Sequence, residues 1–66
     1  MTSYYVNNNP QPTGEHEVHK DTCTYLPPNR TYLGAFFNCK DAIVAAKRYY
    51  NNVDGCFWCS RDCHTR

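Results

Sequence analysis

The sequence predicts a small α+β domain with an N-terminal β-hairpin, a further strand, one α-helix and a cysteine-rich C-terminal turn. Three observations predict it. The chain has 66 residues, which is enough for one domain and one core. Segments rich in aromatic and β-branched residues precede a single amphipathic segment. The last three of the five cysteines then cluster near the C-terminus. We therefore expect a single domain over residues 1–66.

The N-terminal segment predicts the hairpin. Residues 3–7 read Ser-Tyr-Tyr-Val-Asn and favour a short strand. Asparagines, prolines and Gly14 follow and are typical of a turn. Residues 15–19 alternate in polarity and can pair back on the first strand. The alternative is that residues 1–14 form a flexible tail.

The best strand of the chain is expected at Thr31–Phe37. The preceding segment, residues 23–30, contains two adjacent prolines and predicts a loop, because proline donates no backbone hydrogen bond. Gly34 interrupts the strand pattern and indicates a β-bulge or a close backbone approach.

One helix follows, with recognisable signals at both ends. Asn38 is a good N-cap, and Asp41 lies near the positive end of the helix dipole. Lys47 and Arg48 suit the negative end, and the glycine- and asparagine-containing residues 51–55 are expected to end the helix. The apolar stripe on this helix comprises Ala42, Ile43, Ala46, Tyr49 and Tyr50.

A chain of this length needs stabilisation beyond its core. Small domains bury too little surface to fold comfortably on apolar burial, and the mean hydropathy here is −0.78. We expect a cytoplasmic protein, because the sequence shows no secretory signal and no membrane-spanning apolar run. Cytoplasmic thiols are kept reduced, so the cysteines favour a metal site over disulfides. The odd number of cysteines, five, agrees with this interpretation.

Two Cys/His pairs predict the metal site. Cys56 and Cys59 form a C-x2-C directly after a glycine, a spacing that suits two neighbouring ligands of a tetrahedral Zn²⁺. His19 and Cys23 supply a histidine and a thiolate four positions apart, within an expected tight turn. A strand and a helix separate the pairs, so one ion would tie both ends of the domain together. The predicted cofactor is therefore structural Zn²⁺ held by His19, Cys23, Cys56 and Cys59.

Four other residues leave the ligand set and the thiol chemistry open. Cys63, His64 and His16 are alternative ligands, although His16 should face the opposite side of its strand from His19. Cys39 is most simply a buried thiol. Its place at a helix N-terminus also makes it a candidate reactive thiol. A Cys39–Cys63 disulfide would need oxidising conditions.

Several function classes are disfavoured. The formal charge is +1, from seven Lys/Arg against six Asp/Glu, so the strong basicity typical of nucleic-acid binding is absent. Residues 16–19 do not have the H-E-x-x-H spacing of metalloproteases. A closed four-ligand site has no open position for hydrolysis, so we expect no enzyme. The aromatic residues are expected to form the core rather than a base-stacking surface.

The order of elements resembles a known zinc module. A hairpin, His19-x3-Cys23, a strand at 32–37, a helix near Asn38 and Gly55-Cys56-x2-Cys59 look like the amino-terminal zinc domain of the Ada DNA-alkylation-repair protein. The chain is also similar to Ada-like modules appended to bacterial nucleases, and to a group of uncharacterised small bacterial Cys/His-rich proteins.

The resemblance implies a zinc-stabilised fold but not the repair reaction. In the repair protein a cysteine that accepts methyl groups occupies the position of His19, and imidazole does not replace a zinc-activated thiolate. The expected function is a non-catalytic structural zinc module, a monomer without membrane contact, that binds protein or nucleic acid. The alternatives are a thiol-reactive or metal-handling protein that uses Cys39 and Cys63, and a disulfide-stapled domain of the cell envelope.

Overall fold

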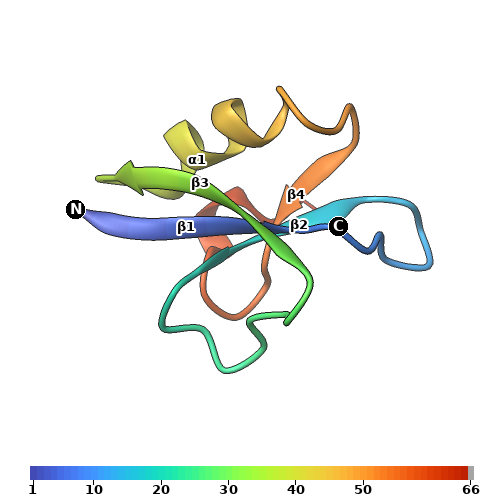
Figure 1. The fold of residues 1–66 in the computed structure, drawn as a ribbon, viewed down its shortest axis with the longest axis horizontal. Coiled ribbons are helices and arrows are strands. Elements are labelled where there is room, and N and C mark those ends of the chain that lie inside the picture. Colours follow the sequence, from blue (N-terminus) through green and yellow to red (C-terminus); the bar gives the residue numbers. More distant parts are fainter. Residues whose placement is uncertain (66) are drawn as a thin grey trace.

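Four strands form one mixed sheet beside a single α-helix in the computed structural model, which describes residues 1–65 (Figure 1). This confirms the small α+β class. The order of strands across the sheet is β3-β1-β2-β4. Arg66, the last residue of the predicted cysteine-rich tail, lies outside the described residues. The elements are β1 (Thr2–Asn7), β2 (His16–Lys20), β3 (Arg30–Phe36), α1 (Cys39–Ala46), β4 (Val53–Gly55) and the 3₁₀ helix η1 (Arg61–Cys63).

The predicted hairpin forms from β1 and β2. The two strands pair antiparallel, with Tyr5 opposite His19. On its other edge β1 pairs with β3, so β1 is an inner strand of the sheet. Two side chains of this strand, those of Tyr4 and Val6, are buried in the core.

Gly34 lies at the bulge that the sequence predicted. The pairing of β1 with β3 shifts from Tyr4–Gly34 to Tyr5–Tyr32, which leaves Leu33 as the extra residue. Gly34 has a φ of 127°, a conformation that residues with a Cβ rarely adopt. The bulge lets β3 twist around the hairpin.

The helix begins where expected but ends early. The side-chain oxygen of Asn38 accepts a hydrogen bond from the Asp41 amide at 3.0 Å, which confirms the N-cap. α1 has eight residues and ends at Ala46, so the two tyrosines of the predicted stripe follow the helix. The buried side chains of the helix are Cys39, Ala42 and Ala46. Within the described residues, no helix has the length and apolar character needed to cross a bilayer.

The segment expected only to end the helix contains a strand. Val53–Gly55 forms β4, which pairs in parallel with β2 and places Gly55 opposite Val18. The amide of Cys56 continues this ladder by donating to the carbonyl oxygen of Val18 at 2.9 Å. The pairing brings the Cys-x2-Cys segment beside the end of β2 (Figure 1).

The core is small and contains few aromatic side chains. It centres on Tyr4, Val6, Val18 and the buried helix residues, with Phe36 packed at its edge. The expectation that the aromatic residues form the core is wrong for Tyr32, Phe37 and Trp58, whose exposed fractions are 54%, 85% and 68%.

Candidate metal centre

The structure brings together the four residues that the sequence singled out as metal ligands. The ligand atoms of His19, Cys23, Cys56 and Cys59 all lie within 4.8 Å of one another. The Sγ atoms of Cys23 and Cys56 are 3.8 Å apart, and Cys59 Sγ is 4.0 Å from His19 Nδ1. A tetrahedral ion with Zn–S bonds of about 2.3 Å places its sulfurs about 3.8 Å apart. This Cys/His cluster could therefore hold a metal such as zinc.

Strand alternation directs His19 to the cluster. Val18 packs in the core beside the helix, so the next residue points to the opposite face of the sheet. His16 lies on the helix side with Val18, and its ring stacks on Tyr50 with the centroids 3.6 Å apart. The expected separation of His16 and His19 onto opposite faces is confirmed.

Gly55 allows the Cys-x2-Cys turn to close against the C-terminal segment. A Cβ at this position would lie 2.6 Å from the carbonyl oxygen of Ser60 and 2.7 Å from Cβ of Cys63. The turn itself is closed by the amide of Ser60, which donates to the carbonyl oxygen of Cys56 at 2.9 Å. A larger residue at position 55 would therefore collide with the backbone of Ser60 and with Cys63.

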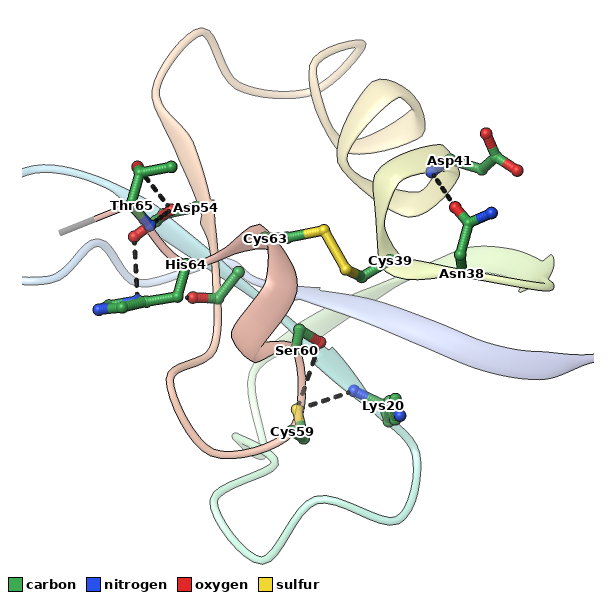
Figure 2. The surroundings of a disulfide bond; sticks show 11 residues. Lys20, Asn38, Cys39, Asp41, Asp54, Cys59, Ser60, Cys63, His64 and Thr65 are labelled. Atoms are coloured by element: carbon green, nitrogen blue, oxygen red, sulfur yellow. Dashed lines mark hydrogen bonds and ion pairs between the residues drawn. A yellow bond between two sulfur atoms is a disulfide. The ribbon is translucent and has the colours of Figure 1, made fainter.

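Backbone amides point at all three free sulfurs. The Tyr25 amide donates to Cys23 Sγ at 3.4 Å, and the Trp58 amide donates to Cys56 Sγ at 3.4 Å. In both of these hydrogen bonds the donor amide belongs to the residue two positions after the cysteine. Cys59 Sγ accepts from the Lys20 amide at 3.2 Å (Figure 2). Such donors stabilise thiolates, which are the form of cysteine that binds metals.

The three thiols do not ionise alike in the absence of a cation. Burial raises the pKa of Cys56 to about 12 and also raises the pKa of Cys23. Burial acts in the same direction on Cys59, but hydrogen bonds from His19, the Lys20 amide and Ser60 outweigh it and lower the Cys59 pKa to about 6. A divalent cation is the group that would allow all three sulfurs to be thiolates together.

Glu17 lies beside the metal cluster, and the sequence analysis did not single it out. Its Oε1 lies 3.5 Å from Nε2 of His19, whose other ring nitrogen faces Cys59. Carboxylates in this position orient a ligating histidine and raise its basicity. A signal was present, because residues two apart on a strand share a face.

Neither alternative histidine joins the cluster. Nδ1 of His16 lies 2.9 Å from the carbonyl oxygen of Asn7, outside the metal group. Nδ1 of His64 lies 3.0 Å from the carbonyl oxygen of Gly55 and 3.3 Å from Asp54 Oδ2 (Figure 2). Both rings are occupied by local packing and hydrogen bonding.

Cys39 and Cys63 are bonded to each other. Their S–S distance is 2.05 Å, and the bridge joins the start of α1 to η1 (Figure 2). This bears out the alternative of a Cys39–Cys63 disulfide, so Cys63 offers no free thiol to the cluster and Cys39 is neither a free buried thiol nor a free reactive one. The physical reason is that η1 folds back beside the first turn of the helix, which sequence spacing alone does not reveal.

Asp54 anchors the end of the described chain. This carboxylate is 3% exposed, and its Oδ1 accepts from the amide and hydroxyl of Thr65 at 2.9 and 3.0 Å (Figure 2). The interaction holds the segment after η1 against β4. The sequence analysis did not single out this residue.

The chain matches no model of a known protein family, no curated protein and no solved structure. The likeness to Ada zinc modules therefore stays a prediction. The observation that supports a metal-binding function is the close approach of the four ligand atoms.

Replacing Glu17 should weaken metal binding. Glu17→Ala removes the carboxylate beside His19, and we expect the affinity for Zn²⁺ to fall by about 10- to 100-fold. Competition with a chromophoric zinc chelator measures this. Asp21→Ala is the control, because it removes an exposed carboxylate a few residues away. Equal affinities for the two variants would show that Glu17 does not support the site.

Removing the disulfide should destabilise the zinc-loaded domain. The bridge closes a segment with a sequence separation of 24 residues. The Cys39→Ala/Cys63→Ala double variant should lose about 2–4 kcal/mol of unfolding free energy, because the unfolded chain regains freedom. Urea unfolding without reductant measures the loss. A double variant as stable as the oxidised wild type would contradict the bridge.

Proposed function

We propose that this protein is a non-catalytic module whose fold is held by one structural Zn²⁺ bound to His19, Cys23, Cys56 and Cys59. The observation that carries the proposal is the mutual approach of these four ligand atoms within 4.8 Å. Three sulfurs and one imidazole are a donor set typical of structural zinc. Four protein ligands complete a tetrahedron and leave no position for a reacting water.

The energetics of the chain support this proposal. The fully buried side chains are few, and the largest of them are Tyr4, His19, Val6, Val18 and Cys56. Zinc contributes about 10–16 kcal/mol to the folding of finger peptides, whereas whole domains are stable by only about 5–15 kcal/mol. A metal at this site would therefore dominate the stability of the fold.

The proposal includes kinship with Ada-like zinc modules and a role in binding protein or nucleic acid. The sequence of hairpin, His-x3-Cys, strand, helix and Cys-x2-Cys supports the kinship. His19 stands where the methyl-accepting cysteine would be, so alkyl transfer is not part of the proposal. We further propose a monomer in a compartment where the three cluster thiols stay reduced.

Native mass spectrometry combined with chelation tests the metal proposal. We expect one Zn²⁺ per chain and loss of the folded circular dichroism signal after chelation, since the binding energy is folding energy. Cys56→Ala should abolish stoichiometric binding. His16→Ala and His64→Ala are matched controls that should each retain one ion, because neither ring belongs to the cluster. A chain that keeps its fold without metal would refute a structural role.

The disulfide supports a second candidate function. Cys39 and Cys63 are bridged while the three cluster cysteines remain free, so the chain holds a separate two-electron redox pair. Cys39 also lines a surface hollow beside the cluster. Two glutathione molecules would reduce the bridge to two thiols and form one glutathione disulfide. In an oxidising compartment the bridge would persist, as in the envelope-domain alternative.

Glutathione redox buffers distinguish a redox function from a structural bridge. The zinc-loaded protein is equilibrated at several poises, and free thiols are then labelled with an alkylating reagent and counted by mass. Two more labels per chain at the cytosolic redox potential than at the secretory one would support reversible redox chemistry. A bridge that stays oxidised at the cytosolic poise would refute it.

A further inference from the structure

A hollow of about 540 Å³ lies beside the candidate metal centre. Its base contains the buried residues Tyr4 and Ser60 together with the ligand Cys59. The remaining lining comes from three separate places in the chain: the end of β2, the start of α1 and the segment around η1. We call this hollow the knuckle groove.

Exposed aromatic rings border the knuckle groove. Trp58 and Phe37 both line it, with exposed fractions of 68% and 85%. Trp58 also lines a second hollow of about 360 Å³, together with Tyr25, and the two rings are 5.8 Å apart. Trp58 therefore forms a wall shared by two adjacent hollows. The core does not require these rings, since they are largely in solvent.

The position of Trp58 follows from the metal cluster. Trp58 lies between Cys56 and Cys59, whose sulfurs point inward to the other ligands. Its amide donates to Cys56 Sγ, which holds the backbone of the turn. A metal ion would therefore fix an exposed ring on a rigid loop. Rigid aromatic side chains that face solvent are typical of binding surfaces.

Cations gather in the same groove. Among residues 1–65, the charged residues that line it are Lys20, Lys40, Arg61 and one acid, Asp62. A zinc centre with three thiolates would add one negative charge, and the groove would still carry a positive net charge. The guanidinium of Arg61 stacks over the ring of Phe57 at 4.8 Å, which holds one of these cations next to the Cys-x2-Cys turn.

We infer that the knuckle groove binds single-stranded nucleic acid. The lysines and Arg61 face the phosphates, and the exposed face of Trp58 stacks on an unpaired base. A duplex does not offer its base faces to such a ring. An acidic peptide would satisfy the cations but would leave the ring without a planar partner. The inference deepens the proposed function and rests on it, because the metal fixes the loop of Trp58.

Tryptophan fluorescence tests the inference directly, because Trp58 is the only tryptophan in the chain. The zinc-loaded protein is titrated with a ten-nucleotide thymidine oligomer at low salt. We expect the fluorescence to be quenched and the affinity to fall with salt. Three phosphate contacts predict a slope of log K against log salt of about −2.

Paired variants separate stacking from charge. Trp58→Ala, followed by anisotropy of a labelled oligomer, should bind about 5- to 150-fold more weakly, the range expected for one stacked base. Tyr49→Ala is its control, since it removes a ring that is 57% exposed but lies outside the groove. Lys40→Ala should reduce the salt slope by about 0.7, whereas Lys47→Ala should leave the slope unchanged.

Three results would overturn the inference: no quenching at millimolar oligomer, equal or tighter binding of the matching duplex, or equally tight binding of a glutamate decapeptide. Zinc stoichiometry, measured on the same samples, distinguishes this failure from failure of the proposed function. A chain that holds one zinc but does not bind the oligomer overturns the inference alone. A folded, metal-free chain that binds the oligomer overturns the structural zinc proposal alone.

Discussion

Two Cys/His pairs that are distant in the sequence converge at one place in this fold. His19 and Cys23 end the hairpin, while Cys56 and Cys59 follow β4, and the four ligand atoms meet within 4.8 Å. The parallel pairing of β2 with β4 and the absence of a side chain at Gly55 make this approach possible. The apolar core beside the cluster is small. A shared cation would link the two ends of the chain where side-chain burial cannot.

The same geometry explains the surface. Because the sulfurs of the Cys-x2-Cys turn point inward, Phe57 and Trp58 between them project outward, with exposed fractions of 38% and 68%. The inward direction of the two sulfurs and the exposure of the two aromatic rings are therefore consequences of one local backbone conformation. The cations that line the adjacent groove come from other elements, so only the assembled fold brings charge and ring together.

The two sets of cysteines have different surroundings. Three face one another with backbone amides directed at their sulfurs, an environment that favours a metal. Cys39 and Cys63 instead meet between the helix and η1 and form a bridge. The aromatic residues divide in a similar way, with Tyr4 buried and Phe37 almost fully exposed. Residue type does not determine which cysteines are bridged or which aromatic rings are buried. The element that packs against each residue determines it.

The sequence by itself determined what depends on neighbours in the chain. The hairpin, the Asn38 cap, the bulge at Gly34 and the four side chains that could hold a metal were all predicted, because local backbone preferences and donor chemistry can be recognised from short motifs. Tertiary structure decided the three-residue strand β4, the exposure of Trp58 and the formation of the Cys39–Cys63 bridge, which the sequence left only as a possibility. Each of these features depends on which elements pack against each other. In so short a chain that packing is set by pairing between segments distant in the sequence, not by local propensity.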